Sequence, residues 1–150
     1  ALDIQNNFEK LGPIKYTKSE QEYAKAIQKV TGKREVGMDG AIHPLKDTMP
    51  AQGGSTDVGD VSQIVPVVRL STPAAPKDAP WHSWAVVAWT GMAIGHKGML
   101  HATKALGMTI VDLFENPQLV KEVKVEFKER KGSSKYEAMI PSGPPPIPQQ

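Results

Sequence analysis

Residues 98–114, GMLHATKALGMTIVDLF, carry the most regular helical pattern of this chain. Apolar side chains recur there at intervals of three and four residues, which places them on one face of a helix. They are Met99, Ala102, Leu106, Ile110 and Leu113. The pattern predicts a helix over 98–114 that could begin as early as Ala93, and its apolar face needs covering by elements that these residues do not supply.

A second helix is expected directly after the first. Asn116 is a good N-cap and Pro117 suits the first helical position, so a helix should run from Pro117 to Lys131, ahead of Gly132. Its charged face should be solvated. The inward face should hold Val120, Val123 and Phe127.

Two more helices are predicted in the N-terminal part. Thr17 and Glu20 form a capping-box pattern at the start of a helix over residues 18–31, and Gly32 can end it. A shorter helix over residues 4–11 would end at Gly12 and Pro13. Ile4, Phe8 and Leu11 would share one side of it.

The remaining stretches predict one strand and long loops. Residues 64–70, IVPVVRL, form a short β-branched apolar run that indicates a strand, with Pro66 favouring an edge or a bulge. Residues 31–59 show no sustained period, and a loop of that length is usually functional or disordered. The proline-rich end of the chain should be extended.

Composition and charge exclude several classes of protein. Lys and Arg total 18 against 16 Asp and Glu, and a net charge of +2 is too small to indicate a surface for nucleic acid. The absence of cysteine excludes disulfides and thiolate zinc sites, so a metal site would use His, Asp and Glu. The longest weakly polar stretch, 85–94, has about half the length that spans a bilayer. We expect no membrane segment and a cytoplasmic location, and the first residues, ALD, suit a processed or excised piece better than an export signal.

Four histidines are the candidates for metal binding and for proton transfer near neutral pH, at positions 43, 82, 96 and 101. His82 is the best of them, because Trp81 and Trp84 could exclude water and fix its imidazole. The simpler alternative is a surface loop whose tryptophans pack on the body while His82 bonds a carbonyl. His96 could be an ordinary residue near a helix start between two flexible glycines, and His101 a helix-face residue bonded to solvent.

The segment GGSTDVGD, residues 53–60, supplies glycines, hydroxyls and carboxylates that suit a polar ligand. It lacks the Gly-Lys-Ser/Thr of a phosphate-binding loop and the ligand spacing of an EF-hand. A turn that leads into the strand, in which Asp57 or Asp60 accepts hydrogen bonds from backbone N–H groups, fits the segment equally well.

Three segments in the same order and spacing carry a family resemblance: GGSTDVGDVS at 53–62, WHSW at 81–84 and IGHKGML at 94–100. Over residues 7–132 the chain resembles the M20 family of metal-dependent amidohydrolases and peptidases, in particular the p-aminobenzoyl-glutamate hydrolases within it. The resemblance implies an α/β fold, the C-terminal portion of a zinc-exopeptidase-like catalytic domain, with helices packed on part of a mixed sheet. That portion would cover residues 1–132, and a proline-rich extended tail would cover 133–150.

The resemblance also implies a site. His82 would be a ligand of a divalent metal, expected to be one of a zinc pair, and substrate would be bound by Ser55, Thr56, Asp57 and His96. No residue receives a catalytic role, because the family's His-x-Asp ligand motif and the acidic pair with its general base have no counterpart here. We therefore expect the chain to be inactive alone and to require the remainder of the catalytic domain or a partner subunit.

The expected substrate is a small amide such as p-aminobenzoyl-glutamate or a related N-acyl amino acid, and the expected state is an oligomer. The alternative function is a non-catalytic module that binds a ligand or partner through the same glycine-rich and tryptophan-rich loops.

Overall fold

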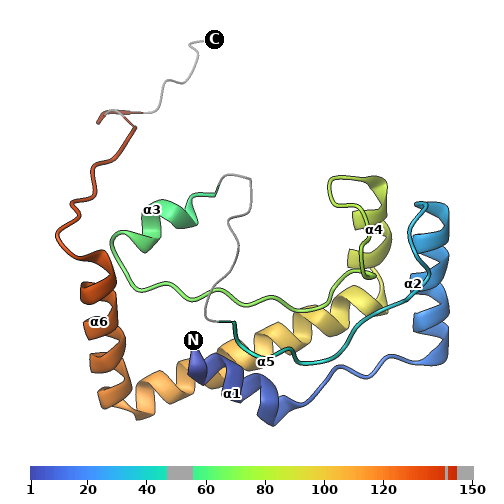
Figure 1. The fold of residues 1–150 in the computed structure, drawn as a ribbon, viewed down its shortest axis with the longest axis horizontal. Coiled ribbons are helices and arrows are strands. Elements are labelled where there is room, and N and C mark those ends of the chain that lie inside the picture. The colour runs from blue at the N-terminus through green and yellow to red at the C-terminus, as the bar shows by residue number, and fades with distance from the viewer. Residues whose placement is uncertain (47–55, 141, 145–150) are drawn as a thin grey trace. The chain divides into compact units, whose positions relative to one another are not determined.

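The computed structural model describes residues 1–46, 56–140 and 142–144, and all regular structure in these ranges is α-helical (Figure 1). The helices are α1 (Leu2–Leu11), α2 (Lys18–Val30), α3 (Val58–Ser62), α4 (Trp84–Thr90), α5 (Ala93–Glu115) and α6 (Pro117–Lys131). Contacts divide the chain into two compact units, one formed by Ala1–Met49 and Arg69–Pro117 and the other by Pro50–Val68 and Gln118–Gln150.

The core of the first unit lies where α2, α4 and the start of α5 meet. Trp89 of α4 is fully buried there, and Ile94 of α5 is almost so. Figure 1 shows α2 and α4 side by side at one end of α5. The other buried members of this core are Ala24, Ile27, Met38, Ala79 and Ala85.

A buried glutamine ties the loops to this core. The Gln28 side-chain amide donates to the carbonyls of Lys77 (2.8 Å) and Gly37 (3.3 Å), and its oxygen accepts from the Gly37 N–H (2.7 Å). Gly37 has a φ of 78°, a left-handed conformation that glycine adopts without strain. One polar side chain therefore satisfies backbone groups of two irregular segments that have no ladder of their own.

The other contact of α5 is with α1, which lies along it (Figure 1). Ile4 and Asn7 of α1 are buried, and on α5 the buried residues of this contact are small ones, Ala105 and Thr109. The side chains predicted to share the apolar face of α5 are largely exposed, Met99 at 57% and Ile110 at 53%. The described elements leave this face largely uncovered, as the sequence predicts, because α1 packs on the small-residue side of α5, where the two backbones can approach closely.

The glycines at the start of α5 are required by packing. A Cβ on Gly98 would lie 2.7 Å from the Pro73 carbonyl oxygen, and one on Gly95 would collide with the backbone of Trp89 and Thr90. Both glycines are buried. The interpretation of these residues as flexible is corrected: they let α5 press against α4 and against the chain at Pro73.

The four helix predictions are confirmed within a few residues. The capping box of α2 is present, with the Glu20 N–H donating to Thr17 Oγ1 (3.2 Å) and the Thr17 N–H to the Glu20 carboxylate (2.6 Å). α1 ends at Gly12 and α6 begins at Pro117, as their local signals predict. The helices α3 and α4 were not predicted.

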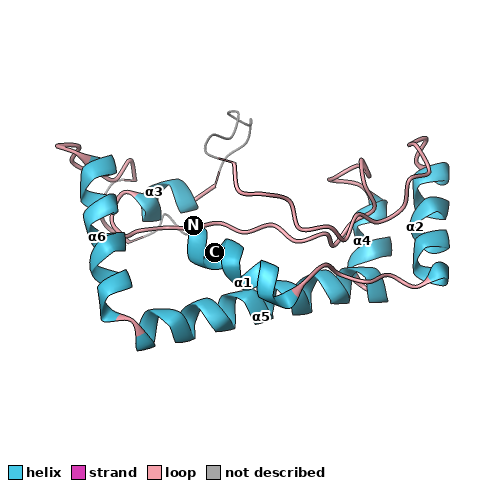
Figure 2. Ribbon diagram, turned by 60° about the horizontal axis from the view of Figure 1, so that its bottom comes forward, coloured by secondary structure: helices cyan, strands magenta, loops and turns pink. Residues whose placement is uncertain are grey.

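The predicted strand over 64–70 is wrong, and so is the α/β fold of helices packed on part of a mixed sheet. Figure 2 shows helix and loop only, and the described residues contain no strand. Ile64 is 60% exposed and Val68 48%, so the apolar run covers no helix face. An extended segment becomes a strand only by pairing its backbone with another, and no described segment provides that edge.

The second unit holds α3 and α6. Val120, Val123 and Phe127 are the half-buried stripe of α6, although no residue of this helix is fully buried. At its end, Lys131 Nζ donates to the Gln63 carbonyl (2.6 Å). The domain boundary predicted at residue 132 stays a prediction; residues 133–140 contain no helix, and 141 and 145–150 lie outside the described residues. None of the described helices combines the length and apolarity needed to cross a membrane.

Candidate functional site

His82 lies in a turn that is held from both sides. Ser83 caps α4: its hydroxyl accepts from the Ala85 N–H (3.3 Å) and donates to the Pro80 carbonyl (2.8 Å). His82 itself has a φ of 58°, in the left-handed region that a histidine rarely occupies. The turn thus presents the His82 side chain, which is exposed, immediately before α4.

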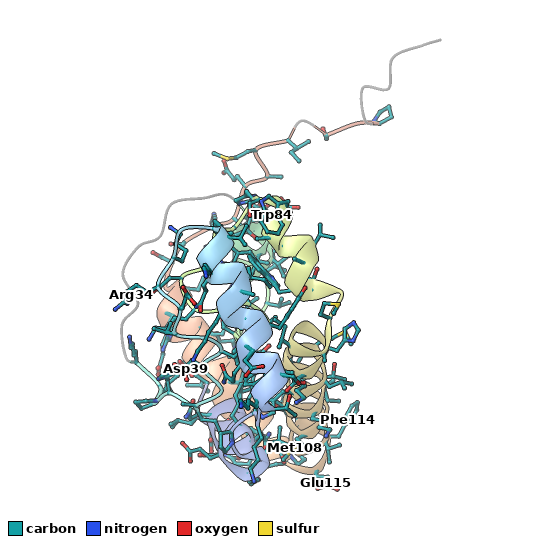
Figure 3. All side chains as sticks on the ribbon, turned by 90° about the vertical axis from the view of Figure 1, so that its right-hand side faces the viewer. Arg34, Asp39, Trp84, Met108, Phe114 and Glu115 are labelled. Atoms are coloured by element: carbon teal, nitrogen blue, oxygen red, sulfur yellow. The ribbon has the colours of Figure 1, made fainter. Side chains whose placement is uncertain are left out.

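The tryptophans beside His82 do not shield it within this chain. Trp81 is 67% exposed and Trp84 60%, although Trp81 contacts the buried Trp89 edge to face at 5.8 Å. Figure 3 shows the Trp84 side chain near α2 and α4. We expected these tryptophans to exclude water from His82, and within this chain they do not. The role of His82 as a metal ligand stays a prediction.

His96 is exposed within a motif whose other members are packed. Gly95 and Gly98 fit against backbone, and Ile94 is 1% exposed. Lys97 Nζ donates to the Glu20 carboxylate (2.6 Å) and to the Lys15 carbonyl (2.9 Å). Within 94–98, packing accounts for every residue except His96, whose side chain is exposed at the start of α5. Its predicted contact with substrate remains a prediction.

The glycine-rich segment falls in the second unit, whereas His82 and His96 belong to the first. Ser55 lies outside the described residues. Thr56 and Asp57 are exposed; Thr56 Oγ1 accepts from the Val58 N–H (3.3 Å), and the Asp57 carboxylate makes no capping bond to α3. The predicted Asx-type turn is thus replaced by a threonine turn into α3, and the substrate roles of Ser55, Thr56 and Asp57 stay predictions.

The other two histidines have structural contacts. His101 Nε2 lies 2.9 Å from the Gly12 carbonyl, and its ring packs on Phe8 with centroids 5.3 Å apart, so it joins α5 to α1 rather than facing solvent. His43 Nε2 lies 3.1 Å from Asp39 Oδ2 at the surface. Among the residues that the structure describes, no three His, Asp or Glu side chains come close enough to hold a metal ion.

Two polar clusters had not been predicted from the sequence. In one, Asn7 Nδ2, fully buried, donates to Thr109 Oγ1 (3.1 Å) and to Asp112 Oδ2 (2.7 Å) across the contact of α1 with α5. In the other, Lys97 bonds Glu20 and lies over the Tyr16 ring (5.6 Å). The sequence does contain a signal for the first cluster. Asn7 is a polar residue beside Ile4 on an otherwise apolar side of its helix, and such a residue needs a polar partner when it is buried.

These clusters shift pKa values through identifiable contacts. The Lys97 hydrogen bond, followed by that of the Thr17 backbone, holds the pKa of Glu20 below its ordinary value. Burial, reinforced by the nearby Glu20 and Asp39 charges, raises the pKa of Tyr16 to about 12. Both shifts belong to groups that join segments far apart in the sequence, Glu20 to Lys97 and Tyr16 to Pro73.

Comparison with known proteins gives a relative but no family model and no solved structure. No protein-family model matches the chain, and no solved structure matches it significantly. One of the subunits of the p-aminobenzoyl-glutamate hydrolase of Escherichia coli (strain K12) is 34% identical over 115 residues, which are 77% of this chain. The chain is related to this hydrolase. It spans 24% of the length of that relative, so most of the relative has no counterpart in these 150 residues.

Proposed function

We propose that this chain forms part of an M20-like, metal-dependent amidohydrolase that cleaves p-aminobenzoyl-glutamate or a related N-acyl amino acid. The observation that carries the proposal is the 34% identity to part of a p-aminobenzoyl-glutamate hydrolase over 77% of the chain. The cytoplasmic location expected from the sequence is part of the same proposal.

In this proposal His82 is one ligand of a divalent metal ion, expected to be zinc. Its support is the capped turn at Ser83, which fixes the backbone at His82 while leaving the imidazole accessible. The described residues do not by themselves fit a metal site, because one histidine supplies one ligand where a stable site takes three or four. The other ligands and the general base come from the remainder of the catalytic domain or from a partner polypeptide, and the relative is itself named as a subunit.

Substrate contacts in this proposal come from His96, Ser55, Thr56 and Asp57. His96 is supported by its exposure beside tightly packed neighbours, since packing gives no other reason for an imidazole there. Thr56 and Asp57 are exposed polar groups that can bond an amide or a carboxylate partner. In this proposal the chain supplies groups that bind the substrate and one side chain that binds the metal, and it is inactive by itself.

The test is a His82→Ala variant of the hydrolase assembled with its partner polypeptide. The variant should lose at least one equivalent of bound metal, measured by elemental analysis, and the hydrolysis of p-aminobenzoyl-glutamate. A His43→Ala variant is the matched control, because the His43 imidazole is also exposed and its bond in the described structure is to the surface carboxylate of Asp39. Unchanged metal content and activity in His82→Ala would show that the assigned role is wrong, and full activity of the chain alone would exclude the need for a partner.

One observation favours a second function, a non-catalytic binding module. Trp81, Trp84 and Val87 are at least 60% exposed around the start of α4, and exposed apolar groups that include aromatic side chains mark binding surfaces. Such a module would bind its ligand without metal. Titration of the chain with p-aminobenzoyl-glutamate in the presence of a chelator, followed by tryptophan fluorescence, separates the two: saturable binding without metal favours the module.

A further inference from the structure

His82 holds a backbone conformation that its own side chain does not explain. Its φ of 58° lies in the left-handed region, where a Cβ crowds the following carbonyl oxygen and only glycine fits freely. The imidazole is exposed, and within the part of the chain that the structure describes it makes no hydrogen bond or ring contact. By its backbone alone, position 82 would suit glycine better than histidine.

Asp78 provides a comparison within the same loop. It is the other non-glycine residue with a positive φ among the described residues, at 60°. Its carboxylate accepts a bond from Arg34 (3.4 Å), so its side chain has a contact in the folded chain. His82 has none, and the strain at His82 is therefore not offset by a contact of its own side chain.

The conformation of His82 is imposed by residues on both sides of it. Before it, Ala79 is buried, and the Trp81 ring contacts the buried Trp89 edge to face at 5.8 Å. After it, Ala85 is fully buried in the first turn of α4. The chain between these fixed points is short, which leaves the backbone at His82 little freedom.

The Ser83 hydroxyl joins the two sides of this turn. It donates to the carbonyl of Pro80 (2.8 Å), two residues before His82, and accepts from the N–H of Ala85 (3.3 Å), three residues after it. The accepted bond caps α4, whereas the donated bond closes the turn around His82. A serine or threonine hydroxyl makes both bonds with one atom, whereas a carboxylate can only accept.

Strain that the surrounding structure maintains is typical of functional positions. At His82 the described structure gives neither packing nor hydrogen bonding as a reason for an imidazole. What the closed turn provides is a fixed backbone from which an accessible imidazole projects. A group held in this way loses less freedom when it binds, and so binds more tightly.

We infer that Ser83 is a positioning residue for His82. The bond from its hydroxyl to the Pro80 carbonyl holds the left-handed backbone and keeps the imidazole presented before anything binds to it. The inference rests on the proposed function in one respect, which is that the His82 imidazole acts by binding metal. The strain is a property of this chain and can be measured without metal or partner.

Urea denaturation of the chain measures the strain at His82. His82→Gly should raise the folding equilibrium constant at least about fivefold, because glycine adopts the left-handed conformation freely. His82→Ala is the matched control and should change the constant less than about twofold, since alanine keeps the Cβ and the imidazole has no contact to lose. No gain in His82→Gly, or an equal gain in both variants, would overturn the inference.

A double-mutant cycle tests whether the Ser83 hydroxyl maintains this strain. Ser83→Asp keeps an acceptor for the Ala85 N–H but cannot donate to Pro80, so α4 stays capped while the turn can relax. In that background the gain from His82→Gly should fall below about twofold. Ser83→Thr keeps both bonds and should keep the full gain. An undiminished gain in Ser83→Asp would show that other contacts hold the turn.

Zinc binding by the hydrolase assembled with its partner polypeptide tests the consequence for function. Ser83→Ala, which removes the hydroxyl without adding a charge, should lower the affinity for zinc at least about tenfold, and Ser83→Thr should restore it. Thr90→Ala is the matched control, because its hydroxyl also lies on α4 but bonds the Val86 carbonyl (2.8 Å).

The two proposals fail in different ways. If His82→Ala keeps its full metal content, the proposed function is wrong and the positioning of a metal ligand falls with it. If His82→Ala loses metal while Ser83→Ala binds zinc as tightly as the parent, the proposed function stands and the positioning role of Ser83 is excluded.

Discussion

Glu20 and Lys97, 77 residues apart, form an ion pair of 2.6 Å through the same carboxylate oxygen that closes the capping box of α2. The side chain of Glu20 is 13% exposed and that of Lys97 33%. A local signal for helix initiation is thereby joined to the long-range contact that places α5 beside α2. Loss of either side chain should therefore weaken both the start of α2 and the contact between α2 and α5.

Removal of this ion pair should change stability most above pH 5. The pKa of Glu20 is held below its ordinary value first by Lys97, so the ion pair stabilises the folded chain above the unfolded pKa of the carboxyl. That contribution is lost as the pH falls through the folded pKa. Lys97→Met should lower the free energy of unfolding at pH 7 by about 1 kcal/mol and less at pH 3, as measured by urea denaturation.

The matched control for Lys97→Met is Lys18→Met. Lys18 pairs with Glu22 at 3.9 Å with its side chain 93% exposed, and such pairs contribute a few tenths of a kcal/mol. If both variants lost the same free energy of unfolding at pH 7, the ion pair of Glu20 with Lys97 would contribute no more than an exposed surface pair.

Ionisation of Tyr16 should destabilise the chain in alkali. The Tyr16 hydroxyl donates to the Pro73 carbonyl (2.9 Å), and its pKa is raised to about 12, so the folded state favours the neutral phenol. The resulting stability is complete below pH 10 and is lost as the pH rises from 10 to 12. Tyr16→Phe should lose about 1 kcal/mol at pH 7 and show a smaller alkaline decline. An ultraviolet titration in which the parent ionises one more phenol than the variant near pH 10 would argue against the raised pKa.

Asn7 should be required for the contact between α1 and α5. Asn7→Ala removes two donated hydrogen bonds and leaves Asp112 without its 2.7 Å partner at a partly buried position, for a loss of roughly 1–3 kcal/mol. Asn6→Ala, at the exposed neighbouring position of the same helix, should change stability by less than about 0.5 kcal/mol. Thermal denaturation of both variants measures the difference, and similar melting temperatures would contradict a role for Asn7 in this contact.

Alanine substitutions at two glycines of α5 should have opposite effects on the stability of the chain. Gly98→Ala places a Cβ 2.7 Å from the Pro73 carbonyl oxygen and should destabilise the chain, whereas nothing lies within 4 Å of a Cβ at Gly107. Because alanine favours a helix over glycine, Gly107→Ala should stabilise by up to about 1 kcal/mol. Urea denaturation gives both values, and a gain in stability for Gly98→Ala would show that α5 does not pack closely on this segment.

The helices were predictable because their signals are local. The capping box of Thr17 and Glu20, the stop at Gly12 and the start at Pro117 each act within one turn, and each helix begins or ends near the predicted residue. The unpredicted α4 also has a local cap in Ser83, but its run of apolar residues carries no helical period that distinguishes it from a buried strand. The candidate residues His82 and His96 could be selected from sequence by their neighbours, and both lie exposed at the start of a helix.

The sequence by itself determined where the main helices begin and end, because backbone capping depends on residues a few positions apart. The tertiary structure decided two other things. Residues 64–70 form no strand, since a strand requires a second backbone to pair with. α5 buries its small residues rather than Leu106 and Ile110, because Gly98 and Ala105 allow close approach to the chain at Pro73 and to α1. Hydrophobic spacing shows that a helix has an apolar face, but which face another element covers depends on the shapes of both.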